Sequence, residues 1–171
     1  MKKKIITIIT LLAILTITLA YLIMNRPASH ATVYVDPHII GRPVDQDFTI
    51  SVTVSRVVDL YGWSFKLRWN STILEVVNVT EGTFLRNGGS TFFDPKINNT
   101  AGHILVVATL IPNIPGSEIP GVSGNGTLAT IQFHVKEDGA CDLILYDTLL
   151  ANSAEQSITH IVFNGHFNST S

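Results

Sequence analysis

The chain has only one cysteine, Cys141, so it cannot form an internal disulfide bond. Outside the cell a free thiol is either buried or paired with a cysteine of another chain, and we expect Cys141 to be buried. Charged residues make up only 14% of the chain, and after residue 31 seven basic residues stand against 13 acidic ones. The resulting net charge near −6 argues against a nucleic-acid partner, because binding to phosphates needs an excess of Lys and Arg.

Charge is missing altogether between Ile5 and Met24. These 20 residues would form a helix about 30 Å long, which matches the hydrocarbon core of a bilayer. Three lysines precede the segment, and because positive charge marks the cytoplasmic side, we expect the N-terminus inside and the remainder outside. Ser29-His30-Ala31 offers small residues at the spacing of a signal peptidase site, so cleavage stays open, although we favour an uncleaved anchor. Residues 1–31 are thus predicted to be a signal anchor or signal peptide with a short hinge, and residues 32–171 a domain on the extracellular face of the membrane, or secreted after cleavage.

Signatures of catalysis are absent as well. The chain lacks the nucleophile elbow, the phosphate-binding loop and the zinc metalloprotease helix. The histidines show no typical metal-ligand spacing, and two carboxylates per site are too few for calcium. The groups weighed for a metal are His134, His160 and His166, Asp45 with Asp47, and Asp138 with Asp142. We therefore expect no catalytic residues, no metal and no cofactor.

What the chain does contain, after residue 31, is alternation of hydrophobic and polar residues with period two. In Asp47–Val57, for example, Phe48 and Ile50 point to one side and Thr49 and Ser51 to the other. Many short strands of this kind predict an all-β, antiparallel sandwich of two sheets, in which each strand has its hydrophobic side covered. The nine expected strands are Thr32–Asp36, Asp47–Val57, Tyr61–Trp69, Leu74–Thr80, Thr91–Ile97, His103–Leu110, Leu128–Val135, Cys141–Thr148 and Ile158–Phe167.

Three further features bear on surface and core. The stretch Pro112–Gly126 holds three Pro and four Gly, which predicts the longest exposed connection. Trp63 and Trp69 fall on the same side of a predicted strand, where core packing explains them better than a sugar-binding platform. The segment His103–Leu110 is hydrophobic on both faces, which indicates a central strand or a partner surface.

Five asparagines open an Asn-x-Ser/Thr acceptor sequence and are glycosylation candidates. We favour the two that fall in predicted turns, Asn70 and Asn125. The full set is Asn70, Asn78, Asn98, Asn125 and Asn168.

The segment Trp69–Val76, with the sequence Trp-Asn-Ser-Thr-Ile-Leu-Glu-Val, resembles the cohesin domain family, whose members run from an aromatic residue through Asp-Pro to Leu-Glu-Val. The segment Val79–Leu85 is similar to the family's Gly before a hydrophobic pair. Gly102–Leu105 agrees with the same pattern, and Gly126–Lys136 is similar to the family's Gly-x-Leu-Ala-x-Ile-x-Phe strand. The order of these blocks holds across Val33 to Phe167.

This resemblance implies a nine-stranded jelly-roll sandwich that docks a small calcium-binding dockerin module of another protein, typically to assemble polysaccharide-degrading enzymes on a scaffold or at a cell surface. The calcium would belong to the dockerin. The resemblance also implies a docking face on the third, fifth, sixth and eighth strands. Here that face comprises the segment Thr91–Ile97 and the partner-binding candidates Ser64, Lys66, Arg68, His103, Leu105, Val107 and Thr109.

The surface departs from the family pattern. Gly62 and Ser64 stand where many dockerin-binding cohesins have Asn and Asp, and Leu110-Ile111 replaces an acidic residue. Because specificity resides in surface side chains, these changes bear on the partner and not on the fold. Our leading hypothesis is a non-catalytic extracellular module that docks a dockerin-type or other protein partner. A carbohydrate-binding module and a structural surface-layer subunit remain as alternatives.

Overall fold

The computed structural model describes residues 30–114 and 116–170, which contain ten β-strands and one short helix. The elements are β1 (Ala31–Asp36), β2 (Ile39–Arg42), β3 (Asp47–Arg68), β4 (Leu74–Glu81), α2 (Thr83–Arg86), β5 (Thr91–Asn98), β6 (His103–Leu110), β7 (Val122–Val135), β8 (Ala140–Asn152), β9 (His160–Phe163) and β10 (Gly165–Ser169). The all-β prediction is confirmed. No helix in the described residues has the length and hydrophobicity needed to cross a bilayer. The predicted N-terminal helix, residues 5–24, lies outside the described residues.

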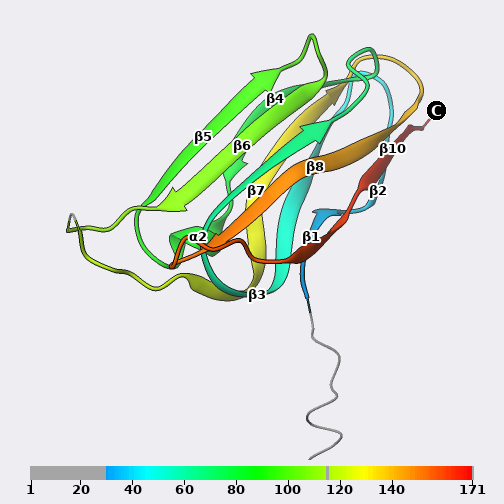
Figure 1. Cartoon of the computed structure of the whole chain (residues 1–171). Helices are drawn as coiled ribbons and strands as arrows, with labels where there is room; N and C mark the ends of the chain where they lie inside the picture. Colours follow the sequence, from blue (N-terminus) through cyan, green and yellow to red (C-terminus); the bar gives the residue numbers. More distant parts are fainter. Residues whose placement is uncertain (1–29, 115, 171) are drawn as a thin grey trace, which may run out of the picture.

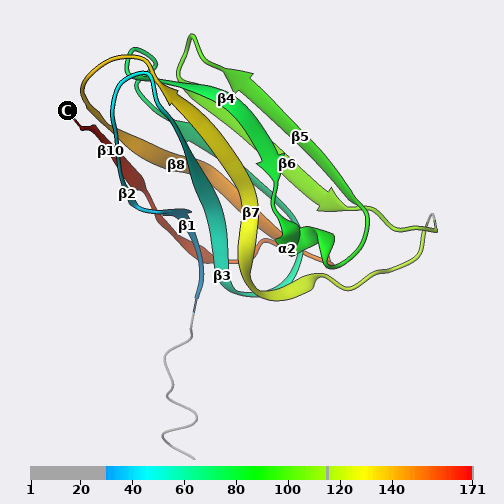
Figure 2. The same cartoon turned by 180° about the vertical axis from the view of Figure 1, so that it is seen from behind.

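Strand β3 is shared by both layers of the fold (Figures 1 and 2). Its first half pairs with β1 and β7, and β9 and β4 extend that layer on either side. Its second half pairs with β6 and β8, and β5, β10 and β2 complete the other layer. All ten strands are therefore hydrogen-bonded into one curled sheet that closes on itself as two packed layers.

The bend between the two halves lies at residues 55–61, where the pairing of β3 with its neighbours shifts register. Arg56 and Asp59 have φ angles of 56° and 58°, which bulged strands adopt where they turn sharply. The Asp59 carboxylate accepts hydrogen bonds from the Gly121 N–H at 2.7 Å and the Ser153 hydroxyl at 2.7 Å. On the other side the Asn125 side-chain oxygen accepts from the Arg56 N–H at 2.7 Å. The Gly121 backbone, the Ser153 side chain and the Asn125 side chain of β7 thus hold the corner.

The core lies between the layers and follows the predicted alternation, with Ile50, Val52 and Val54 of β3 fully buried. At one end Phe48 stacks between Phe133 and Phe167, with ring centroids 5.4 Å and 5.1 Å apart. The buried hydrophobic side chains of the described residues run from Ala31 to Phe167 and form one core cluster.

Both tryptophans belong to this core. Trp63 and Trp69 are only 3% and 7% exposed. The Trp69 ring packs edge-on against Phe133 at 5.3 Å, and its Nε1–H donates to the Leu74 carbonyl at 2.9 Å. The core interpretation of these rings is confirmed.

The strand count, however, was wrong in three places. The two predicted strands Asp47–Val57 and Tyr61–Trp69 form the single strand β3, because the bulges at the corner bend the strand without ending it. Strand β2 was missed, and Ile158–Phe167 is divided into β9 and β10. The sandwich is also not wholly antiparallel, since β1 with β9 and β2 with β10 form parallel pairs at the edges.

The predicted loop Pro112–Gly126 is shorter than expected, because β7 already begins at Val122. Gly116 lies in a turn with a φ of 81°, whereas Gly126 lies in β7, where a Cβ would lie 2.7 Å from a ring carbon of Phe84. Cys141, at the start of β8, is half-buried, and desolvation raises the pKa of its thiol.

We expect Phe133→Ala to lower the free energy of unfolding by about 3–5 kcal/mol, because it leaves a cavity between stacked rings. Urea unfolding of residues 31–171, followed by circular dichroism, measures this loss. The matched control is Phe92→Ala, which truncates a ring that is 51% exposed and should cost far less. Equal losses in the two variants would contradict the described core.

A second prediction concerns the corner. The hydrogen bond from the Ser153 side chain and that from the Gly121 backbone lower the pKa of Asp59. A carboxyl group whose folded pKa lies below its unfolded value stabilises the fold above about pH 4, and that contribution is lost as pH falls through the folded pKa. Asp59→Asn should therefore destabilise the domain at pH 7 but approach wild type near pH 3. Glu155→Gln removes a charge from the neighbouring turn and serves as control, and parallel pH profiles for Asp59→Asn and wild type would refute the assignment.

Candidate binding face

The outer surface formed by β5, β6, the second half of β3 and β8 is one continuous four-stranded face, turned toward the viewer in Figure 1. Because Trp63, Phe65 and Leu67 point into the core, the alternate residues of β3 point outward. The same holds for the other strands. We define the four-stranded face by the outward residues Gly62, Ser64, Lys66, Arg68, Phe92, Asp94, Lys96, Asn98, His103, Leu105, Val107, Thr109, Ile144, Tyr146, Leu149 and Ala151.

Strand register places the predicted residues side by side on this face. Lys66 lies opposite Leu105, Ser64 opposite Val107, and Arg68 opposite His103. Thr109 lies opposite Gly62 at the far end. All seven predicted partner-binding residues thus share one surface with Phe92, Asp94 and Lys96 of the segment Thr91–Ile97, whereas Phe93 of that segment packs against the core. Their role in binding stays a prediction.

The face has a hydrophobic half and a basic half. In the hydrophobic half Phe92 and Leu149 are 51% and 48% exposed, and Val107 lies between their strands. At one end of the hydrophobic half, Gly62 has no side chain to project from the surface. A Cβ at this position would lie only 3.3 Å from the Thr109 hydroxyl. An exposed hydrophobic surface of this kind, bordered by charge, is typical of a protein interface.

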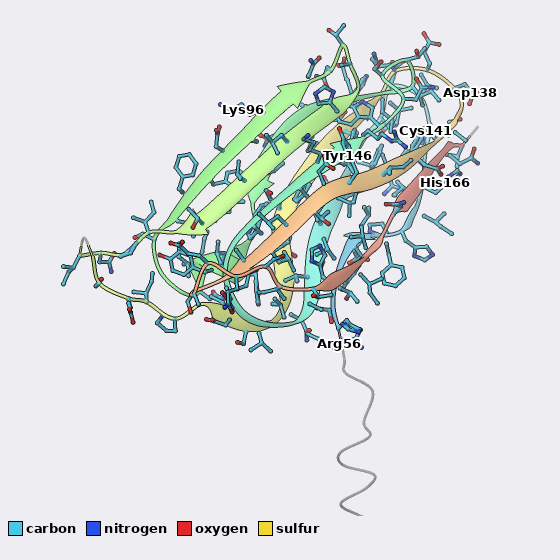
Figure 3. All side chains as sticks on the ribbon, viewed as in Figure 1. Arg56, Lys96, Asp138, Cys141, Tyr146 and His166 are labelled. Atoms are coloured by element: carbon cyan, nitrogen blue, oxygen red, sulfur yellow. The ribbon has the colours of Figure 1, made fainter. Side chains whose placement is uncertain are left out.

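The basic half surrounds a shallow hollow of about 420 Å³. Figure 3 labels Lys96 and Tyr146 on two of the contributing strands. We call this the basic hollow; its lining residues are Lys66, Lys96, Ile97, Asn98, His103, Leu105 and Tyr146.

Tyr146, like the other residues that β8 contributes to this face, was not singled out by the sequence analysis. Its ring lies 5.7 Å from the Lys66 ammonium and 5.9 Å from the Arg68 guanidinium, so it holds both cations on the face. The alternation in Cys141–Thr148, with Leu143 and Leu145 inward, already indicated that Tyr146 points outward.

Both lysines also have carboxylate partners. Lys66 Nζ lies 3.0 Å from Asp147, and this hydrogen bond raises the pKa of Lys66. Asp147 occupies a bulge of β8 with a φ of 48°, which moves the register by one residue between Tyr146 and Leu149. Lys96 Nζ lies 3.1 Å from Asp94 of its own strand.

The groups weighed for metal binding do not converge. Each of three histidines is hydrogen-bonded within the domain: His134 to Asp47 at 2.7 Å, His166 to Asp142 at 2.7 Å, and His160 to Thr148 at 2.8 Å. Within residues 30–114 and 116–170, no three His, Cys, Asp or Glu side chains form a group suited to a metal.

The sequon asparagines are all exposed. Asn70 lies in a turn, as predicted, whereas Asn125 lies in β7 and not in a turn. Asn98 lines the basic hollow. Whether any of the five carries a glycan stays a prediction.

Comparison with known proteins gives a consistent picture. The family model of the Cohesin domain matches residues 39–168. No curated protein sequence matches the chain. Among solved structures, a non-cellulosomal cohesin from the hyperthermophilic archaeon Archaeoglobus fulgidus is 20% identical, with a TM-score of 0.67 over 84% of this chain and 93% of its own.

Two bacterial structures are equally similar. The sixth cohesin of scaffoldin B from Acetivibrio cellulolyticus, solved with a mutant Cel5 dockerin, is 17% identical, with a TM-score of 0.68 over 83% of this chain and 100% of its own. A chain of a type I cohesin–dockerin complex from Clostridium thermocellum is 13% identical, with a TM-score of 0.66 over 85% of this chain and 98% of its own. Because these sequence identities are low, the structural similarity supports a shared fold alone.

Proposed function

Because this chain belongs to the cohesin domain family, we propose that it is a non-catalytic binding module that docks a dockerin-type protein partner on its four-stranded face. Solved relatives occur in complexes with dockerins, which supports a protein partner of that kind. The family resemblance implies a jelly-roll sandwich of nine strands. The domain has ten strands, and nine remain when the short edge strand β2 is left out of the count.

The observation that carries the proposal is the outward side of β6. Leu105 and Val107 are only half-buried, and the elements that contact β6 are β3, β5 and α2. A central strand with hydrophobic residues on both sides normally has both sides covered. The outer side of β6 is thus suited to a cover from another molecule.

We further propose that residues 1–31 attach residues 32–171 to the outside of the cell membrane. The support is the charge-free run of 20 residues behind three lysines. Strand β1, which follows this segment, starts at one end of the sandwich (Figure 1) and belongs to the layer opposite the four-stranded face. A role in polysaccharide degradation or cell-surface assembly would follow from the partner.

The two alternatives have less support. A carbohydrate-binding module needs exposed coplanar rings, and Trp63 and Trp69, its strongest candidates, lie in the core. The hypothesis of a structural surface-layer subunit rests on exposed sequons such as Asn78 and Asn168. Sequons indicate sites for glycans, and they do not by themselves form a surface for contacts between subunits.

The docking proposal predicts that Leu105→Gln weakens binding of a dockerin module about tenfold or more, because it places a polar group at the centre of the interface. Calorimetric titration of residues 31–171 with dockerin modules encoded in the same genome measures the dissociation constants. Thr49→Gln, an exposed change on the opposite layer, is the control and should bind like wild type. Absence of micromolar binding to every dockerin, or equal binding by both variants, would refute docking at this face.

The anchor proposal predicts that the full chain sediments with membranes and resists extraction by high salt. Protease added to intact cells should degrade the domain, because it lies outside. Recovery of the domain from the medium with a new N-terminus near residue 32 would show cleavage, whereas protease-resistant protein inside cells would contradict export.

A further inference from the structure

Basic side chains are concentrated on the four-stranded face although the domain as a whole is acidic. After residue 31 the chain has seven Lys and Arg residues, and three of them, Lys66, Arg68 and Lys96, lie on this face. His103 lies beside Arg68 in the neighbouring strand. Positive charge is therefore concentrated on this face, although residues 32–171 as a whole carry a net charge near −6.

Two acidic side chains, Asp94 and Asp147, lie within ion-pairing distance of the lysines that line the basic hollow. Of the 13 acidic residues, Asp94 and Asp147 belong to or border the face, and Asp142 follows beyond its last row, where it bonds to His166. None of these carboxylates lines the hollow, whereas Lys66, Lys96 and His103 do.

The existing ion pairs leave both lysines free to interact with a further anion. The Lys66 and Lys96 side chains are 38% and 68% exposed. Ion pairs at such exposure are weak, so a second carboxylate can share or replace the first partner. Removing water from the hollow on association would strengthen that contact.

We propose that the basic hollow receives carboxylate side chains of the partner's docking surface, so that recognition by this domain depends on an acidic partner. The inference rests on the proposed docking function. Many dockerin-binding cohesins have Asn and Asp where this chain has Gly62 and Ser64. In this domain, selectivity for the partner depends instead on the cations of Lys66, Arg68 and Lys96, which lie further along the strands.

The occupant is a protein surface because the hydrophobic half of the face adjoins the hollow, with Val107 two residues from Leu105 on the same strand. Val107, Leu149 and Phe92 would contact aliphatic and aromatic side chains next to the partner's carboxylates. An anionic polysaccharide would satisfy the lysines but would leave these hydrophobic side chains without a matching partner.

Selection of random linear peptides displayed on phage against residues 31–171 tests this inference. We expect the selected peptides to carry Asp or Glu beside hydrophobic residues. Lys66→Glu and Lys96→Glu should each weaken their binding about tenfold or more, and Lys66→Arg should retain it. Lys136→Glu reverses a charge outside the face and is the control. Raising the salt concentration from about 0.05 M to 0.3 M should weaken binding several-fold, because salt screens the exposed lysines of the free domain from the partner's carboxylates.

The outcomes separate this inference from the docking proposal. Peptides whose binding is lost in Leu105→Gln but is unaffected by Lys66→Glu, Lys96→Glu and salt would refute the acidic partner and leave the docking face standing. Peptides unaffected by all three substitutions would refute both. Tighter binding of polygalacturonate than of any peptide, lost in Lys66→Glu, would assign the hollow to an anionic polysaccharide and overturn the inference. Circular dichroism of each variant verifies that the fold is retained.

Discussion

One continuous strand, the 22-residue β3, runs through both layers, and the rest of the structure depends on that continuity. A strand that belongs to two packed layers must bend. It bends where Arg56 and Asp59 adopt positive φ angles, the Arg56 N–H donates to Asn125 of β7, and the Asp59 carboxylate accepts from the Gly121 N–H. Its alternation then places Val52 and Phe65 in the same core from opposite layers. The residues between these inward positions form the centre of each outer surface.

The four-stranded face follows from this bend. The second half of β3 lies between β6 and β8, so its outward residues Ser64, Lys66 and Arg68 have neighbours on both sides. Hydrophobic residues come from β6, and Tyr146 of β8 positions two of the cations. Such a combination of an aromatic ring, arginine and exposed hydrophobic residues is what protein interfaces concentrate at their centres.

Local patterns predicted much of this because they depend on neighbours along the chain. Alternation in Asp47–Val57 and Tyr61–Trp69 showed which side chains face the core, and the register between strands then brought Lys66 opposite Leu105. The same patterns could not show that these two segments are one strand, because the bulges between them are stabilised by Gly121 and Ser153, which are distant in sequence. For the same reason Asn125, beside two glycines, was predicted to lie in a turn although it forms part of β7.

By itself, the sequence determined the class of fold, the inward and outward side of most strands, and the family, because period-two alternation and short ordered motifs need no knowledge of distant contacts. Only the tertiary structure decided that the strands form one curled sheet with parallel edges, and that Tyr146 joins Lys66 and Arg68. It also decided that Lys66, Lys96 and His103, which are distant in sequence, line one hollow, with Asp147 and Asp94 paired to the two lysines. The physical reason is that strand pairing, bulges and the meeting of side chains from different strands are set by long-range hydrogen bonds and packing, which no local pattern encodes.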